Sequence, residues 1–228
     1  MAAQRTPRNP ADGPTRERLV DAAISVLAAS GPAEVKVRRI SEEAGVSTIT
    51  VYHHFGGVRG LLDEVVIRGY SSLRDALLDA EASDDDPGVQ LFAMALATRE
   101  MARSNPHLYD MMFGLSTRGT YRATTPPTPT QHHFREAYGV LVGACERMKT
   151  AARIDIDDPE QIAAQLWSLV HGFVSLEAGG HFDGHEDPVT SVLAPMAVAQ
   201  LVGNGENRVR ATECARTAYM RWRTVHQD

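Results

Sequence analysis

The sequence is poor in cysteine and in long apolar runs, and each shortage excludes a class of protein. The two cysteines, Cys145 and Cys214, lie far apart and match no zinc or redox spacing, so we expect neither a zinc-bound nor a disulfide-rich domain. No apolar run approaches the roughly 18 residues of a membrane span, and residues 1–15 are polar with three prolines, unlike a signal peptide. We expect a cytoplasmic protein with no membrane segment and no cofactor.

Enzyme motifs are missing as well. The sequence has no Gly-x-Ser-x-Gly, no phosphate-binding glycine loop and no paired carboxylates in an apolar setting. The loop His181-Phe182-Asp183-Gly184-His185-Glu186-Asp187 is rich in metal-binding residue types, but its glycine and acidic residues are typical of a solvated loop without a closed ligand set. We therefore predict no catalytic residues and no metal, and an enzyme built on a helical bundle is the alternative.

Charge is unevenly distributed along the 228 residues. The net charge is −6, yet residues 1–60 carry eight Lys/Arg against six Asp/Glu, while residues 61–228 carry fifteen against twenty-three. An overall negative charge argues against nucleic-acid binding by the whole surface, but the front of the chain is compatible with a small DNA-reading segment.

Helical periodicity dominates, and no segment alternates with period two for long enough to suggest a sheet, so the predicted fold is all-α. Residues 1–14 are polar and Pro-rich and are predicted to be a disordered basic arm. Thr15 is the expected N-cap of the first helix. Helices are predicted at 15–30, 37–44, 48–55, 58–82, 88–104, 106–116, 131–152, 159–180, 188–203 and 206–225, with a loop at 119–130.

These elements suggest two domains. A three-helix DNA-binding domain is predicted at 15–57, and it extends into a connector helix at 58–82. A helical-bundle domain that binds a ligand and dimerises is predicted at 83–228.

The segment Ile40 to Phe55 reads ISEEAGVSTITVYHHF and predicts a helix-turn-helix. Ala44 is small enough for two helices to cross closely, and Gly45 permits the sharp turn between them. Ser47 is placed to cap the second helix, so the early residues of that helix would enter a major groove of DNA.

The side chains at the start of that helix suit contacts with DNA. The hydroxyl groups of Thr48 and Thr50 can meet bases or phosphates, and Ile49 can contact a thymine methyl group. The complete set of residues predicted to bind DNA is Lys36, Arg38, Ser47, Thr48, Ile49, Thr50, Tyr52, His53, His54 and Arg59.

The region from Arg16 to Leu62 resembles the DNA-binding domain of the TetR family of transcription regulators. The resemblance rests on the turn Ala44-Gly45-Val46-Ser47, on the run Val51-Tyr52-His53-His54-Phe55 and on Leu61-Leu62. It implies that Thr48, Thr50 and His53 lie near base edges, that Tyr52 and His54 contact phosphates, and that Phe55 lies in the domain core.

Two positions depart from the family pattern. Members of the family usually carry a lysine at the position of Val58, where its ammonium group meets a phosphate, and we expect Arg59 to substitute for it. Lys36 stands where the family favours a threonine that caps the first helix of the pair.

The helix predicted at 159–180 is apolar over most of its circumference, so it needs cover on two sides. We predict that one side is covered by a second copy of the chain, because most soluble oligomers are two-fold dimers and palindromic DNA requires the same symmetry. The predicted interface consists of Ile162, Leu166, Leu169, Phe173 and Leu176.

Residues 167–172 and 106–113 resemble the WHG-type C-terminal domain of a subset of TetR-like regulators. That resemblance implies an all-helical effector domain in which the helices at 159–180 and 188–203 form a four-helix dimer interface. We predict an unknown small apolar or aromatic effector, bound where polar tips lie among apolar side chains. The candidates are Met94, Met101, Tyr109, Met112, Phe113, Phe134, Tyr138, Trp167 and His171.

The predicted function is that of a repressor that binds a palindromic operator as a homodimer and is released by an effector, with the helix at 58–82 as the lever. A helical scaffold that binds only protein is a further alternative, and it would show no salt-dependent binding to DNA. The pattern assigns no role to the basic amphipathic helix at 206–225.

Overall fold

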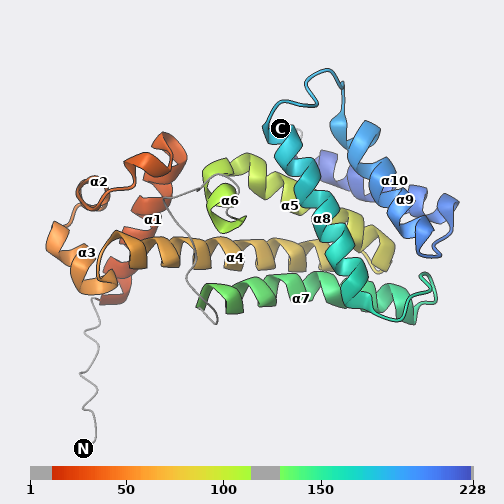
Figure 1. Cartoon of the computed structure of the whole chain (residues 1–228), viewed down its shortest axis with the longest axis horizontal. Helices are drawn as coiled ribbons and strands as arrows, with labels where there is room; N and C mark the ends of the chain where they lie inside the picture. Colours follow the sequence, from red (N-terminus) through yellow and green to blue (C-terminus); the bar gives the residue numbers. More distant parts are fainter. Residues whose placement is uncertain (1–11, 114–128, 227–228) are drawn as a thin grey trace, which may run out of the picture. The chain divides into compact units, whose positions relative to one another are not determined.

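The computed structural model describes residues 12–113 and 129–226, and within them it contains ten α-helices and no strand (Figure 1). The predicted all-α fold is therefore confirmed. The chain divides into two compact units, residues 1–69 with 107–130 and residues 70–106 with 131–228. Most of the predicted basic arm and of the loop at 119–130 lies outside the described residues.

The first unit contains α1 (Asp12–Ser30), the 3-10 helix η1 (Pro32–Glu34), α2 (Val37–Ala44), α3 (Thr48–Phe55) and most of α6 (Pro106–Phe113). The long α4 (Val58–Ala82) contributes residues to both units. The second unit contains α5 (Pro87–Ser104), most of α7 (Pro129–Thr150), α8 (Pro159–Ala178), the π-helical turn η2 (Val189–Leu193), α9 (Ala194–Gly203) and α10 (Arg208–His226).

Several boundaries differ from the sequence prediction. The first helix begins at Asp12, so Thr15 lies inside it and its predicted role as N-cap is wrong. Proline is tolerated in the first turn of a helix because the N–H it lacks would have no partner there, and Pro14 occupies that turn. The compact units also divide at Gly69, within α4, whereas the predicted domain boundary followed residue 82.

The core of the first unit is built on the apolar face of α1. Leu19, Ala23 and Leu27 are fully buried on this face, as its helical spacing predicts. Ile40 from α2 and Val51 from α3 are also fully buried, and burying a side chain of this size contributes roughly 1.5–3 kcal/mol. These contacts orient the outer face of α3 toward solvent.

Helix α6 approaches α4 closely within the first unit. A Cβ atom added to Gly69 would lie 2.5 Å from Sδ of Met112 and 3.3 Å from Cδ1 of Leu108. Such a distance is far below van der Waals contact, so glycine is required here for the two helices to pack as they do.

In the second unit, α5 packs against α8 and α10, and α9 packs against the same two helices. Arg153, which follows α7, joins the ends of these elements. Its guanidinium group donates to Glu206 at 2.6 Å and to Asp86, the N-cap residue of α5. The side chains of Arg153 and Glu206 are each 2% exposed, so this ion pair lies inside the bundle.

Among the residues that the structure describes, every helix is too short or too polar to cross a lipid bilayer.

Candidate nucleic-acid interface and ligand cavity

The turn between α2 and α3 is formed by backbone hydrogen bonds. Gly45 has φ 64°, a left-handed conformation that glycine adopts without strain. Its N–H donates to the carbonyl of Glu42, and the N–H of Val46 donates to that of Ser41. This pair of bonds is the Schellman pattern that ends many helices, so the predicted turn at Gly45 is confirmed.

Ser47 occupies the N-cap position of α3, but its side chain does not cap the helix. Its hydroxyl group instead lies 2.9 Å from Oγ1 of Thr50. The predicted capping bond is therefore wrong, and the two hydroxyl groups form a pair at the start of the helix.

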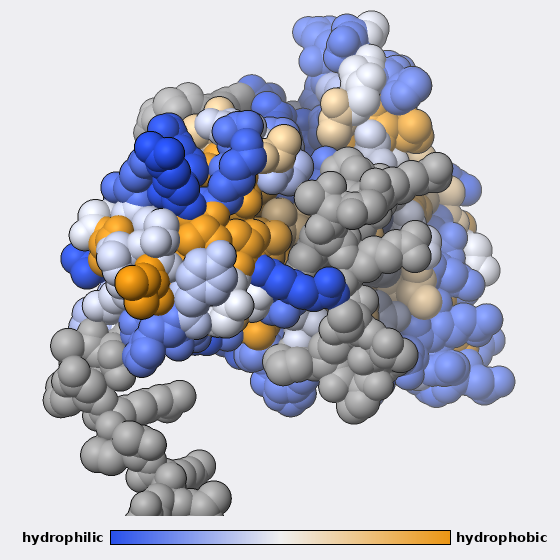
Figure 2. Space-filling model, turned by 60° about the vertical axis from the view of Figure 1, so that its left-hand side comes forward, coloured by the Kyte–Doolittle hydropathy of each residue, from blue (hydrophilic) through white to orange (hydrophobic). Residues whose placement is uncertain are grey.

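The outer face of α3 exposes both apolar and polar side chains. Ile49 is 76% exposed and Tyr52 is 58% exposed, whereas Val51 on the opposite face is fully buried. Figure 2 brings α1 to α3 forward and shows hydrophobic side chains among hydrophilic ones on this surface. Of the other residues predicted to bind DNA, all are exposed except Thr50 and His54, which are half-buried.

Tyr52 lies against the turn that follows α3. A Cβ atom added to Gly57 would lie 3.5 Å from Cε1 of the tyrosine ring, and Gly57 has φ 133°. Phe55 is half-buried, and the guanidinium group of Arg16 lies 5.1 Å from the centre of its ring. The ring of Phe55 therefore packs against the cation of Arg16, and Phe55 is not among the fully buried residues of the core.

Lys36, at the N-cap of α2, and Arg38, within α2, each pair with an acid close by in the sequence. Nε of Arg38 donates to Oε1 of Glu42 at 2.9 Å, and Nζ of Lys36 donates to Oε1 of Glu34 at 3.1 Å. All four side chains are more than half exposed. Because exposed pairs of this kind contribute little to stability, both cations can exchange their partners for phosphate groups.

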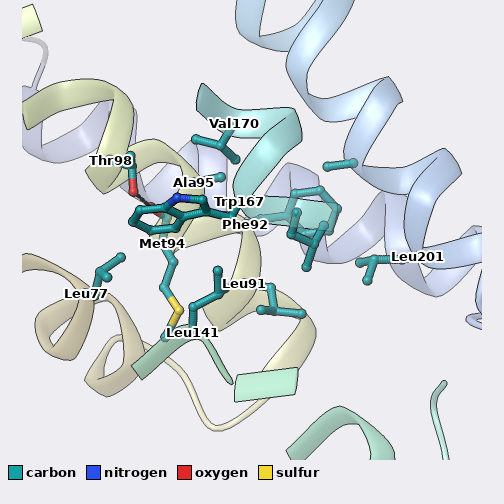
Figure 3. Close-up of a pocket in the computed structure, with 12 residues that line it drawn as sticks. Leu77, Leu91, Phe92, Met94, Ala95, Thr98, Leu141, Trp167, Val170 and Leu201 are labelled. Carbon is teal, nitrogen blue, oxygen red and sulfur yellow. Dashed lines mark hydrogen bonds between the residues drawn. The ribbon is translucent and has the colours of Figure 1, made fainter. Parts of the chain in front are cut away.

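An apolar cavity lies within the second unit (Figure 3). Side chains of α4, α5, α7, α8 and α9 surround it, and Leu77, Met94 and Trp167 point into it (Figure 3). The hydroxyl group of Thr98 lines the cavity but donates to the carbonyl of Met94. The cavity measures about 30 Å³, which is roughly the share of one water molecule in the liquid, so a larger ligand requires these side chains to move.

Four of the predicted ligand residues form an aromatic cluster beside this cavity. The ring of Trp167 lies 5.9 Å from Phe134, 5.6 Å from Tyr138 and 4.2 Å from His171. Burial lowers the pKa of His171 to about 4. The imidazole is therefore neutral at pH 7 and forms part of an uncharged wall.

The other predicted ligand residues are dispersed. Tyr109, Met112 and Phe113 belong to the first unit, and Met101 lines a groove along α10. Only Met94 and Trp167 of the nine candidates line the apolar cavity. Sequence reasoning missed its remaining lining, which is largely aliphatic, because such residues have the same pattern as any helical core. The missed residues are Leu77, Leu91, Phe92, Ala95, Thr98, Leu141, Leu166, Val170, Ala197 and Leu201.

The predicted dimer seam is partly wrong. Ile162, Leu166 and Phe173 are buried inside the chain's own bundle, and a residue in the protomer core offers no surface to a second copy. Leu169 is half-buried and Leu176 is 47% exposed. The outward face of α8 is therefore the one that carries Leu169 and Leu176.

The loop considered as a metal site is held by other contacts. Asp187 accepts hydrogen bonds from the backbone of Val189 and from the hydroxyl group of Tyr219. Nδ1 of His185 lies 2.9 Å from Oγ of Ser191. In the described part of the chain, no three His, Cys, Asp or Glu side chains meet in a way that could hold a metal ion.

Two family models match the chain. Residues 19–65 match the bacterial regulatory proteins of the tetR family, and residues 91–201 match the tetracyclin repressor-like C-terminal domain. The chain belongs to the TetR family. The first match contains the turn at Gly45 and α3, and the second contains most of the residues around the apolar cavity.

Curated transcriptional regulators match the chain over part of their length. The transcriptional regulator BetI 2 of Chromohalobacter salexigens is 33% identical over 81 residues, which are 35% of this chain and 39% of the relative. The transcriptional repressor DrrR1 of Streptomyces coeruleorubidus is 32% identical over 107 residues, 45% of this chain and 38% of the relative. The chain spans from about a third to about half of the length of the curated relatives it matches.

A solved structure shows the same fold over nearly the whole chain. A protein with unknown function from Rhodococcus sp. RHA1 has a TM-score of 0.73 and 24% sequence identity, with coverage of 90% of this chain and 100% of that one. The family membership thus rests on the sequence matches to residues 19–65 and 91–201, and the solved structure shows that the fold is shared. The narrower resemblance to WHG-type domains stays a prediction.

The two departures from the TetR pattern are visible in the structure. Lys36 stands at the N-cap of α2 and provides no side-chain capping bond. Val58 begins α4, and the neighbouring Arg59 is exposed. A phosphate contact by Arg59 in place of the usual lysine stays a prediction.

Proposed function

We propose that this TetR-family chain is a repressor that binds a palindromic operator as a homodimer and is released by a small apolar or aromatic effector. The observation that carries the proposal is the outer face of α3, which exposes Ile49 and Tyr52 beside hydroxyl and imidazole groups. The relative DrrR1 is named a repressor, which supports the same direction of control. The DNA target would place the protein in the cytoplasm, and the proposal assigns it no catalytic step.

The first part of the proposal concerns DNA reading. With α3 in a major groove, Ile49 contacts a thymine methyl group and the hydroxyl groups of Thr48 and Thr50 meet bases or phosphates. Tyr52, Lys36 and Arg38 contact the sugar-phosphate backbone of the DNA, and the two cations exchange their carboxylate partners for phosphate groups. Phosphate contacts by cations make binding weaken steeply as salt rises.

The second part concerns the dimer. Leu169 and Leu176 are seven residues apart and therefore share one face of α8. A shallow groove next to Leu169 is lined by Met196, Ala199 and Gly203 of α9. Small side chains allow the helices of a second copy to approach closely, so this face of α8 and α9 is the proposed four-helix interface.

The third part concerns release. Leu77 lines the apolar cavity and belongs to α4, whose earlier residues 58–69 are part of the DNA-binding unit. An effector that enlarges the small cavity must displace its walls, including Leu77. Displacement of α4 would change the spacing of the two recognition helices in a dimer and lower operator affinity.

DNA reading is tested by fluorescence anisotropy with a labelled duplex from the DNA that flanks the gene. Ile49→Ala and Tyr52→Ala should each weaken binding by about 5- to 100-fold, and higher salt should weaken the parent protein further. Val209→Ala is the matched control, because Val209 is 72% exposed on α10. Equal affinities for all four proteins, or binding that ignores salt, would remove the assignment of α3.

The dimer is tested by analytical ultracentrifugation. Leu169→Arg should convert the dimer to monomer, whereas Leu78→Arg, at a residue 45% exposed on α4, should leave it dimeric. A parent protein that sediments as a monomer at micromolar concentration would contradict the proposed interface.

A further inference from the structure

A second hollow in the C-terminal bundle, the charged recess, shares no lining residue with the apolar cavity. The C-terminal parts of α5 and α8 and the loop that leads from α8 to η2 border this recess, which is open to solvent on one side. Helices α5 and α8 are labelled in Figure 1. Its volume is about 510 Å³, within the roughly 300–1,000 Å³ typical of small-molecule sites. The recess is therefore large enough for a ligand without rearrangement.

The apolar side of the recess is held in place before any ligand arrives. Phe182 stacks on the buried ring of Phe173, with ring centres 5.2 Å apart and an angle of 19° between the planes. Val174, Ala178 and Pro188 complete this side. A wall that is already ordered loses little conformational entropy when a ligand binds.

The loop that carries Phe182 is fixed at both ends. At its start, Gly180 has φ 74° and the N–H of His181 donates to the carbonyl of Leu176 at 3.1 Å. At its end, Asp187 accepts hydrogen bonds from the backbone of Val189 and from Tyr219. The positions of Phe182 and Asp183 therefore follow from the fold of the loop.

One pair of charges in the wall is already neutralised. Arg99 donates to both carboxylate oxygens of Glu177, at 2.7–3.1 Å, and its guanidinium group also lies 5.6 Å from the ring centre of Trp222. Both side chains are largely buried. Because separating a buried pair is costly, Arg99 and Glu177 stay paired and form a neutral part of the wall.

Two further charges line the recess and have opposite signs. Arg103 lies one turn after Arg99 on α5, and Asp183 lies in the loop. Within residues 12–113 and 129–226, neither side chain makes a hydrogen bond or an ion pair. Nε2 of His185 is the remaining polar group on the rim, since Nδ1 is bonded to Ser191.

We infer that the charged recess binds a small zwitterion with an apolar side chain, of the α-amino acid class. Arg103 would donate charge-assisted hydrogen bonds to the carboxylate, and Asp183 would accept hydrogen bonds from the ammonium group. The apolar side chain would pack on Phe182 and its neighbours. A ligand that carries only the carboxylate would face the carboxylate of Asp183, and a ligand that carries only the ammonium group would face the guanidinium group of Arg103. Either contact between like charges disfavours binding.

The inference is tested by isothermal titration calorimetry on the full chain without DNA. The probes are L-leucine, 4-methylpentanoate, which lacks the amine, and 3-methylbutylamine, which lacks the carboxylate. Leucine should bind at least about tenfold more tightly than either analogue. Failure of leucine to bind at about 10 mM, or equal binding by one analogue, would overturn the inference.

Substitutions locate the site. Arg103→Ala and Asp183→Asn should each lower leucine affinity by about 10- to 100-fold, with unchanged circular dichroism because both residues are exposed. Arg208→Ala and Asp85→Asn are matched controls at exposed residues outside the recess and should bind leucine like the parent protein. Unchanged leucine binding in both recess variants would contradict the assignment. Since the measurement contains no DNA, its result is independent of the proposed repressor function.

Discussion

The ion pairs of Arg38 and Lys36 beside the helix-turn-helix differ from the ion pair of Arg153 in the C-terminal bundle both in sequence separation and in burial. In the first region, the partners of Arg38 and Lys36 are four and two residues away and lie at the surface. In the bundle, Arg153 pairs with Glu206 across 53 residues, and both side chains are buried. The difference indicates a division of tasks: surface pairs can be exchanged for DNA phosphates, whereas buried pairs fix how distant segments meet.

The largest expected change in stability comes from breaking the buried ion pair of Arg153 and Glu206. Arg153→Met leaves the buried Glu206 without its cation, which should destabilise the protein by about 3–5 kcal/mol. The double variant Arg153→Met/Glu206→Leu should be clearly more stable than Arg153→Met, because it also removes one stranded carboxylate. Urea denaturation measures both differences.

Arg38→Met is the surface control for this experiment, and its urea transition should match that of the parent protein because its ion pair is exposed. If Arg153→Met proved as stable as Arg38→Met, the buried ion pair would contribute no more to the free energy of unfolding than the exposed one, and the contrast would be contradicted.

The pH dependence of stability gives a second comparison, between an exposed and a buried histidine. His53 lies at the surface of α3, whereas burial lowers the pKa of His171 in the bundle to about 4. An unfolded chain protonates this imidazole near pH 6.5, so between about pH 6.5 and 4 it binds a proton that the folded chain does not. The stability present above pH 6.5 should therefore decline by up to about 3 kcal/mol as the pH falls toward 4.

The comparison of the parent protein with His171→Gln isolates this effect from the titration of carboxylates. Denaturation curves at pH 7.5 and 4.5 should show a smaller loss of stability in the variant. Parallel losses in the two proteins would mean that His171 takes up its proton without unfolding.

The smallest expected effect compares two glycines. A Cβ atom at Gly45 or at Gly139 would meet nothing within 4 Å, but Gly45 has a φ of 64°. Gly45→Ala should cost about 1 kcal/mol from backbone strain, whereas Gly139→Ala within α7 should stabilise by up to about 1 kcal/mol. Thermal unfolding should shift in opposite directions, and shifts of the same sign would contradict the backbone argument.

The sequence was most informative where a signal is local. The bounds of α2, α3 and α4 and the turn at Gly45 were all predicted, because glycine, cap positions and helical spacing act over a few residues. The family match to residues 19–65 confirms the same region. Even here one local detail was wrong, since Ser47 bonds to Thr50 rather than to the helix backbone.

Long-range pairing could not be predicted. Periodicity showed that α8 is apolar around most of its surface, but not that Ile162 and Phe173 face the chain's own core. No sequence pattern predicts that Arg99 forms an ion pair with Glu177, which lies 78 residues later in the chain. Of the nine predicted ligand residues, three belong to the first unit. Residue type alone does not indicate in which of the two units a side chain will pack.

The chain contains only two tryptophans, and the fold places them beside different hollows. Trp167 lines the apolar cavity, whereas Trp222 does not line the charged recess itself but lies 5.6 Å, measured from its ring centre, from the guanidinium group of Arg99 in the recess wall. Variants that keep one indole at a time therefore carry a built-in optical probe, whose emission colour and intensity should report occupancy of one hollow separately from the other.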